Sequence, residues 1–509
     1  MSALPLTPSL ADFCHLASLG NLIPVWTEIL ADAETPVSAF QKLDVGGPSY
    51  LLESAEKSEK AGRYSFVGTR PRLILESRGR LIRITQGGAT REFETSADPL
   101  AELQKIMAAF RWVPVPGLED AAGPSFTGGA VGFLSYNAVR FFEPSVGEPQ
   151  PDPLDLPESV FLLSDAVLVF DHLRKRLRVL VNAHVESPDQ AEQVHRESEA
   201  KIREILAALA RPASLPQLPV PTAPPPPAAA RSNTTREEYL QMVRSSHEYI
   251  HAGDIFQIVP SQRFETEYTG DPLTLYRTLR DVNPSPYMFC IKFGADFALV
   301  GSSPEVHVRA THGHVQIRPI AGTKRRGATP EEDEANAAQL LADPKERAEH
   351  LMLVDLARND VGRIAKFGTV RVTDFMTIER YSHVMHIVSH VTGELRDDCN
   401  AFDVLRATFP AGTVSGSPKV RAMQILGQLE KHKRGVYAGA VGYFGFDGNT
   451  DSCIALRTVV LKNGLACVQT GAGVVADSTP EGEHQECINK AMGMMAAIAR
   501  ARSTAPIQP

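Results

Sequence analysis

The chain has 509 residues, of which 43% are hydrophobic and 22% charged, as is typical of a globular protein with room for several domains. Its net charge of -8 and isoelectric point near 6.0 argue against a nucleic-acid-binding surface, which would be strongly basic. The six cysteines lack metal-ligand spacing, the N-terminus lacks a signal-peptide pattern, and no apolar run is long enough to span a membrane. We therefore expect a cytoplasmic protein.

A proline-rich segment divides the sequence into two regions. Residues 211–232 are rich in proline and alanine, a composition that favours an extended linker and cannot pack a core. They separate an N-terminal region, residues 1–210, from a C-terminal region, residues 233–509.

The N-terminal region predicts short strands followed by one long helix. Residues 73–77 and 81–85 have the pattern of a hairpin, and so do residues 160–171 and 177–185. Residues 189–209 show the apolar periodicity of an amphipathic helix.

The C-terminal region opens with a capping-box pattern at residues 235–238, ahead of an apolar-periodic helix. Strands and helices are then grouped rather than alternating, which indicates an α+β protein. The predicted strands are residues 287–293, 297–302, 306–310, 314–317, 438–446, 452–462 and 465–470, and the predicted helices are residues 331–341, 348–357, 402–408, 418–429 and 480–501. A short sequence echo links residues 128–133 to residues 438–443, which is thin evidence for a duplicated sheet element.

Two pairs of glutamates lie three residues apart in predicted helices. Glu346 and Glu349 form one pair, and Glu483 and Glu486 form the other. Residues at i and i+3 share a helix face, so two such faces brought together would offer the oxygen ligands that Mg²⁺ prefers. A single pair of this kind is usually solvated helix surface, but the anion-binding motifs nearby favour a metal site.

Several segments of the same region are suited to binding an anion. Gly-containing turns at residues 319–323 and 471–473 can present unobstructed backbone N–H groups. Residues 410–419 end at Lys419 and precede a predicted helix, whose N-terminus favours negative charge. Arg457 lies among apolar residues, so its guanidinium needs an anionic partner, either a structural carboxylate or a substrate.

These motifs resemble those of the chorismate-utilising enzymes, and among them anthranilate synthase component I. The matching segments are residues 50–54, 62–68, 319–323, 346–360, 410–421, 437–446 and 471–490. The resemblance implies a large α/β sandwich of two packed antiparallel sheets with outer helices. It also implies that the two sequence regions interleave, so that the linker separates stretches of sequence rather than compact bodies.

The resemblance also implies residue roles. For metal binding these are Glu349 and Glu486 as Mg²⁺ ligands, with support from Glu346 and Glu483. For catalysis they are Glu305, His386 and Thr413: a proton donor to the departing C4 hydroxyl, a residue tied to pyruvate elimination, and a contact near the ring. For substrate binding they are Gly322, Thr323, Tyr437, Arg457, Gly471, Ala472 and Gly473. For binding of the inhibitor L-tryptophan they are Ser54, Pro286, Tyr287 and Met288.

The implied reaction converts chorismate and ammonia to anthranilate and pyruvate, under feedback inhibition by tryptophan. Two positions separate this reaction from its relatives. Ala321 replaces a lysine of aminodeoxychorismate synthase component I, and Gln257 replaces the lysine base of isochorismate and salicylate synthases. Both residues favour anthranilate synthase, with aminodeoxychorismate synthase component I as the alternative.

A partner subunit is expected as well. None of the six cysteines lies in the Gly-x-Cys-x-Gly elbow of a glutamine amidotransferase. Ammonia from glutamine would therefore come from a separate amidotransferase subunit, anthranilate synthase component II, in a hetero-oligomer such as a heterotetramer. The alternative from another class is an inactive scaffold that binds only a regulator, and the intact set of implied catalytic residues disfavours it.

Overall fold

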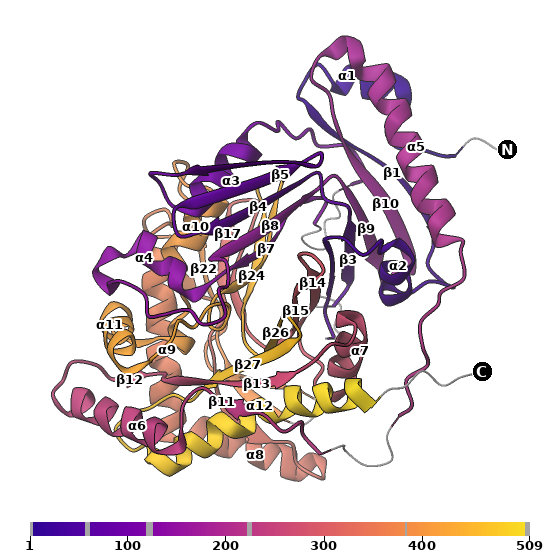
Figure 1. Ribbon diagram of the computed structural model, residues 1–509. Coiled ribbons are helices and arrows are strands. Elements are labelled where there is room, and N and C mark those ends of the chain that lie inside the picture. Colours follow the sequence, from indigo (N-terminus) through magenta and orange to yellow (C-terminus); the bar gives the residue numbers. More distant parts are fainter. Residues whose placement is uncertain (1–3, 56–61, 119–125, 221–225, 382–383, 504–509) are drawn as a thin grey trace.

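Two large antiparallel sheets pack together in the computed structural model, which describes residues 4–55, 62–118, 126–220, 226–381 and 384–503 (Figure 1). Apolar side chains from both sheets form one shared core cluster, with Val131 and Val160 from one sheet and Phe289 and Leu299 from the other. This arrangement confirms the expected α+β sandwich.

The first sheet joins the two sequence regions at the pairing of β2 with β14. Five of its strands precede the linker, one lies at the end of the linker, and five follow it. In order across the sheet they are β1 (Leu22–Leu30), β10 (Arg176–His184), β9 (Ala166–Asp171), β3 (Tyr64–Thr69), β2 (Ser49–Glu53), β14 (Tyr287–Lys292), β15 (Phe297–Ser303), β26 (Thr458–Lys462), β27 (Leu465–Gly471), β13 (Ser261–Glu267) and β11 (Arg231–Ser232).

The second sheet joins the regions at the pairing of β24 with β7. In order its strands are β19 (Arg371–Val372), β22 (Val391–Glu394), β17 (His314–Ile317), β16 (Val306–Thr311), β25 (Thr450–Ile454), β24 (Ala440–Gly445), β7 (Gly129–Leu134), β8 (Ser159–Ser164), β4 (Leu73–Arg78), β5 (Leu81–Gln86) and β6 (Ala89–Glu94). Since both sheets contain strands from both regions, the regions are interleaved.

The two segments that echo each other in sequence are neighbours in this sheet, as β7 and β24. Gly132 lies opposite Gly442. A Cβ at Gly132 would lie 1.9 Å from the carbonyl oxygen of Val160, and one at Gly442 would lie 2.1 Å from that of Asp451. Side chains are therefore excluded at both glycines, which explains the shared small residue.

Two small sheets complete the strand arrangement. One pairs β12 (Gln257–Ile258) with β23 (Gly416–Ser417). The other contains β18 (Ile320–Arg325), β21 (Val384–Val388) and β20 (Thr377–Arg380). Both carry residues of the candidate site.

The helices cover the outer faces of the sheets (Figure 1). They are α1 (Leu10–Leu16), α2 (Pro36–Leu43), α3 (Pro99–Ala108), α4 (Val139–Phe142), α5 (Ala191–Leu209), α6 (Arg236–His251), α7 (Pro272–Val282), α8 (Pro330–Ala342), α9 (Pro344–Gly362), α10 (Ala401–Thr408), α11 (Lys419–Leu429) and α12 (Pro480–Ser503). The predicted helices and the capping box between Thr235 and Glu238 are present. Within the described ranges no helix is long and apolar enough to cross a membrane.

Two of the predicted strands are wrong, because each is a pair of strands that belong to different sheets. Residues 160–171 form β8 and β9, and residues 452–462 form β25 and β26. Asp165 separates the first pair and faces Arg72 at 3.3 Å. Arg457 lies between the second pair with a left-handed φ of +45°. An unbroken apolar run does not reveal where a chain passes from one sheet to the next.

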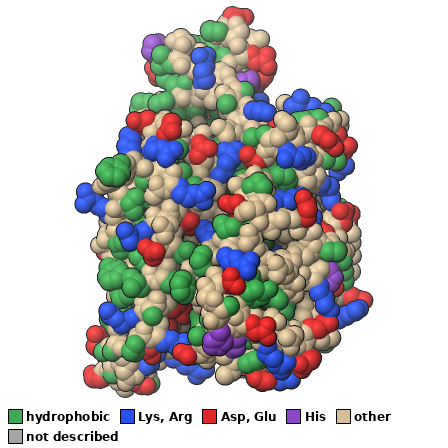
Figure 2. Space-filling model, turned by 90° about the vertical axis from the view of Figure 1, so that its left-hand side faces the viewer, with side chains coloured by type: hydrophobic (Ala, Val, Ile, Leu, Met, Phe, Trp, Pro, Cys, Tyr) green, Lys and Arg blue, Asp and Glu red, His purple; other side chains and the backbone are tan. Residues whose placement is uncertain are grey.

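The described part of the linker lies along the helices. Arg277 of α7 donates to the carbonyl of Pro216 at 2.9 Å, and Arg500 of α12 donates to that of Pro219 at 3.1 Å. Pro224 and Pro225 of the proline run lie outside the described residues. On the face seen in Figure 2, acidic and basic side chains are intermixed, as the modest net charge predicts.

Candidate active site

The two glutamate pairs meet where α9 and α12 begin. Burial raises the pKa of Glu346, and the negative charges of Glu349 and Glu486 raise it further. Burial and the charge of Glu486 likewise raise the pKa of Glu483, although the hydroxyl of Ser478 counteracts this. The two pairs, distant in sequence, are therefore close enough to repel each other. The i, i+3 spacing predicts only that the two members of each pair share a helix face.

Neighbouring donors hold the carboxylates of Glu349 and Glu486. Glu349 accepts a hydrogen bond from Nε2 of Gln257 at 3.1 Å, and Glu486 forms an ion pair with Lys490 at 2.8 Å. The Oε1 atom of Gln257 is buried and has no hydrogen-bond partner among the described residues. In the described ranges, no group of three or more His, Cys, Asp or Glu side chains is arranged to hold a metal. The Mg²⁺ site thus stays a prediction, supported by a repelling set of oxygen donors.

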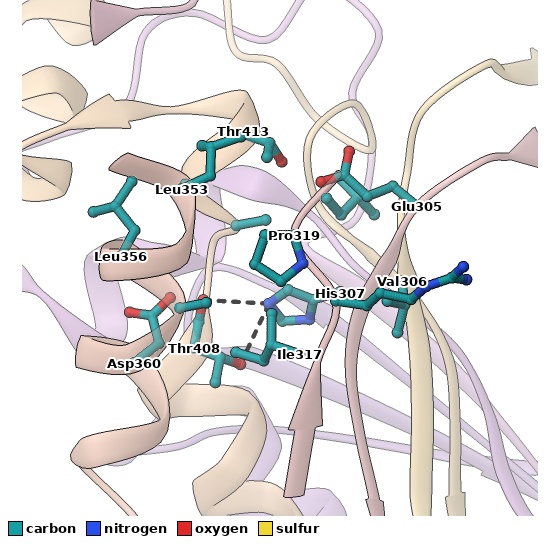
Figure 3. Close-up of a pocket in the computed structure, with 15 residues that line it drawn as sticks. Glu305, Val306, His307, Ile317, Pro319, Leu353, Leu356, Asp360, Thr408 and Thr413 are labelled. Atoms are coloured by element: carbon teal, nitrogen blue, oxygen red, sulfur yellow. Dashed lines mark hydrogen bonds between the residues drawn. The ribbon is translucent and has the colours of Figure 1, made fainter. Parts of the chain in front are cut away.

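Glu305 lies just before β16 and lines a pocket shared with Thr413 (Figure 3). Burial raises the pKa of Glu305 to about 7, although the Thr413 hydroxyl and the charges of Lys490 and Arg457 counteract the rise. The carboxyl is therefore about half protonated near neutral pH. The other end of the pocket contains His307, which interacts with the carbonyl of Thr408 at 3.3 Å.

His386 lies on β21 beside the bulge of β18. Its Nδ1 lies 3.0 Å from the carbonyl oxygen of Gly322 and 3.1 Å from the hydroxyl of Thr323. Because a carbonyl only accepts, this bond places the proton on Nδ1 and leaves Nε2 of the neutral ring free to take one. Burial lowers the pKa of His386, which favours the neutral ring. Gly322 has a φ of +69° and packs against Glu346, since a Cβ there would lie 3.0 Å from Oε2 of that residue.

Arg457 is partly buried at the crossing from β25 to β26. Its Nη1 donates to Oδ1 of Asn283 at a long 3.4 Å, and no ion pair with any carboxylate of the described residues is present. Burial lowers its pKa, and the charge of Glu305 counteracts this. Of the two alternatives for this guanidinium, a substrate anion is therefore favoured over a structural carboxylate. Lys419, by contrast, pairs with Asp360 at 2.7 Å, so the expectation that it holds a substrate anion is not supported.

The glycine turn after β27 lies against Tyr437 and Lys490. A Cβ at Gly471 would lie 2.8 Å from the hydroxyl of Tyr437, and Lys490 donates to the Gly471 carbonyl at 3.2 Å. Ala472 is fully buried, and a Cβ at Gly473 would lie 3.1 Å from Nε2 of Gln257. This turn therefore connects the residues predicted to bind substrate with those predicted to bind metal.

The structure brings the predicted catalytic, substrate and metal residues into one connected cluster. Gly322 packs against Glu346, and Gln257 contacts both Glu349 and Gly473. Lys490 contacts both Glu486 and Gly471. Arg457 lies within the electrostatic influence of Glu305. Lys490 and Asn283 are members of this cluster that the motif analysis did not assign to it. Lys490 lies four residues after Glu486 on the same helix, and side chains at this spacing are neighbours, so the sequence alone could have indicated their contact.

The residues predicted to bind tryptophan form a second group at the junction of β2 and β14. Met288 lies opposite Glu53, and Ala55 donates to the carbonyl of Ser285 at 3.0 Å. The Tyr287 hydroxyl donates to Asp451 at 2.8 Å, so its ring points from the first sheet toward the second. Segments on either side of the linker therefore adjoin here, as predicted.

Comparison with known proteins identifies the family. The sequence pattern of the family described as chorismate binding enzyme matches residues 47–496. Anthranilate synthase component 1 of Acetivibrio thermocellus is 46% identical over 497 residues, which cover 97% of this chain and 99% of that protein. The chain belongs to the chorismate-binding enzymes, in the branch of anthranilate synthase component 1.

Solved structures of chorismate-binding enzymes agree with this assignment. Anthranilate synthase component I of Streptococcus pneumoniae TIGR4 superposes with a TM-score of 0.75 at 36% identity, over 92% of this chain and 99% of that one. The menaquinone-specific isochorismate synthase of Escherichia coli has a TM-score of 0.68 at 18% identity, over 97% of this chain and 99% of that one, and so shares the fold. Two solved enzymes with different names therefore share this fold, so the fold alone does not decide the activity.

Proposed function

We propose that this chain is the large subunit of an anthranilate synthase, which converts chorismate and ammonia to anthranilate, pyruvate and water. The observation that carries the proposal is the full-length similarity to anthranilate synthase component 1 proteins. The site adds support, because Gln257 contacts Glu349 at the position where water-using relatives carry a lysine base. A glutamine cannot act as that base, so ammonia is the expected nucleophile.

In the first half-reaction, ammonia adds to C2 of chorismate while the C4 hydroxyl leaves as water. A hydroxyl leaves readily only when it is protonated, and Glu305 has the pKa of a donor near neutral pH. The guanidinium of Arg457 offers its charge to the enolpyruvyl carboxylate, with Tyr437 and the turn at Gly471–Gly473 beside it.

In the second half-reaction, the C2 proton is removed and the bond between the ring and the enolpyruvyl oxygen breaks, which makes the ring aromatic. The enolate that leaves takes up a proton on its methylene carbon to give pyruvate. The lowered pKa of His386 favours the neutral ring, and its Nδ1 proton is directed at Gly322, so Nε2 can accept a proton. Such a base contributes about 10²–10⁴-fold to a rate.

Mg²⁺ would be held by Glu349 and Glu486, supported by Glu346 and Glu483. When bound, the ion would clamp the ring carboxylate of chorismate and offset its repulsion from the glutamates. Binding would also require Lys490 to release Glu486, with which it is paired.

A glutamine amidotransferase subunit would supply the ammonia within a hetero-oligomer. Relatives named anthranilate synthase component 1 support a second component. The six cysteines are free, and four of them, Cys290, Cys453, Cys467 and Cys487, are buried. L-tryptophan would bind at Ser54, Pro286, Tyr287 and Met288 as a feedback inhibitor.

The decisive experiment incubates the purified chain with chorismate, MgCl₂ and ammonium, and identifies the product by chromatography and fluorescence. Anthranilate with equimolar pyruvate supports the proposal. 4-Amino-4-deoxychorismate would identify the alternative, an aminodeoxychorismate synthase component I, and no turnover would support the inactive scaffold. Glutamine in place of ammonium should give no product until an amidotransferase subunit is added.

A further inference from the structure

Arg434 is a buried arginine that the proposed mechanism does not use. It lies between α11 and β24 and is 3% exposed. Its guanidinium forms two hydrogen bonds with Glu430, at 2.8 and 2.7 Å, and these two side chains are almost fully enclosed. A buried ion pair of this kind does not by itself indicate that the arginine stabilises the fold. The other contacts of Arg434 therefore indicate what it does.

Two of those contacts reach segments that carry candidate site residues. Nη1 donates to the carbonyl of Val414 at 2.7 Å, directly after Thr413, and Nη2 donates to that of Val259 at 2.5 Å. Val259 follows Gln257 in the chain, and its N–H donates to the Ser415 carbonyl at 3.2 Å. The guanidinium of Arg434 thus connects the loop that contains Thr413 to the residue that directly follows strand β12, which contains Gln257.

Arg434 also faces the substrate side of the cluster. The guanidinium lies 5.6 Å from the centroid of the Tyr437 ring and 4.6 Å from that of Tyr136. Its partner Glu430 accepts hydrogen bonds from the backbone N–H and the hydroxyl of Ser261, at 2.9 and 2.8 Å. Ser261 pairs with Gly471 across β13 and β27, so the network extends to the glycine turn.

We propose that Arg434 is a positioning residue that fixes the chorismate-facing side of the site. It does so by joining the segments of Thr413, Gln257, Tyr437 and Gly471 through one guanidinium and Glu430. This inference rests on the proposed function, but its geometry does not involve Glu305, His386 or Arg457. A lysine at position 434 keeps the charge but cannot span two carbonyls and a carboxylate in one plane or stack as a planar group.

The test compares Arg434→Lys with the wild type and with Lys431→Met, which removes an exposed lysine from the same loop. We expect Arg434→Lys to raise the KM for chorismate at least tenfold while changing the KM for ammonium less than twofold. Lys431→Met should leave both unchanged. If Arg434→Lys lowers only the melting temperature and the active fraction, with an unchanged KM for chorismate, the positioning role is wrong.

A second readout does not depend on turnover. Backbone hydrogen exchange should accelerate in Arg434→Lys at residues 257–261, 412–416 and 470–473, and stay unchanged in the outer strands β5 and β6. If hydrogen exchange instead accelerates uniformly across both sheets, the positioning role is wrong. This outcome can be read even if the wild type has no activity on chorismate, so it is distinguishable from failure of the proposed function. If Arg434→Lys does not fold, Glu430→Gln keeps the acceptor for Ser261, and the same local exchange pattern with a smaller rise in KM is expected.

Discussion

The protonation state of Glu305 makes activity depend on pH. Burial raises its pKa to about 7, and the protonated form is the proposed proton donor. At a fixed concentration of free ammonia, kcat/KM should therefore fall as pH rises above about 7. Glu305→Gln should lower kcat by about 10²–10⁴-fold and remove this dependence. The matched control is Glu334→Gln, which changes an exposed glutamate, and a wild-type profile that is flat between pH 6 and 9 would contradict the assignment.

The same residue links function to stability. A carboxyl whose pKa is raised on folding from its ordinary 4.5 to about 7 destabilises the folded protein once it is ionised. This penalty is absent below both pKa values and grows as pH rises between them. Thermal unfolding of Glu305→Gln should therefore occur above the wild-type temperature at pH 8 and at the same temperature at pH 4.

His386 should separate the two half-reactions. With Nδ1 directed at Gly322, Nε2 is the proposed base for loss of the C2 proton, and the proposed first step does not need it. His386→Ala should therefore accumulate aminodeoxyisochorismate and release little anthranilate, as measured by chromatography of quenched reactions. Formation of anthranilate at the wild-type rate would make His386 a packing residue only. His390→Ala, four positions along the same segment, is the control.

Among the elements, α9 and α12 carry the prediction about the metal. Their first two turns place four carboxylates together, with repulsion that a bound cation would relieve. Mg²⁺ should therefore raise the melting temperature of the wild type, corresponding to about 2.7 kcal/mol at one hundred times the dissociation constant. Glu486→Gln should abolish this shift, whereas Glu481→Gln, on the same helix but not among the predicted ligands, should keep it. An equal shift in all three proteins would exclude the proposed ligands.

The elements also show what the sequence could and could not predict. Helix positions, the capping box at Thr235 and the i, i+3 glutamates were predicted, because they depend on local periodicity. The sequence did not predict that residues 160–171 and 452–462 are each divided between two sheets, because an apolar run can continue where the chain passes from one sheet to the other. The hydrogen bonds from Arg434 to Val259 and Val414, and from Arg457 to Asn283, could not be predicted either, since these partners are distant in the chain.

At the scale of the whole molecule, the pairings of β2 with β14 and of β7 with β24 hold the two sequence regions together. The predicted tryptophan site lies at the first of these junctions. Asn283 follows α7 directly before this inhibitor segment, and its side chain accepts the hydrogen bond from Arg457. A ligand at this junction that moves Asn283 would therefore also move Arg457, which is predicted to bind chorismate.

This arrangement predicts reciprocal coupling between the two ligands. Tryptophan should weaken chorismate binding, and chorismate should weaken tryptophan binding by the same factor, typically worth about 1–3 kcal/mol. Ser54→Phe would place a bulky ring at the end of β2, far from the predicted metal ligands. It should relieve inhibition and leave kcat and the KM for chorismate near wild-type values, in steady-state assays of both proteins over a tryptophan series. Equal sensitivity of wild type and variant would exclude this site, because a ring of that size cannot be accommodated where the amino-acid head group binds.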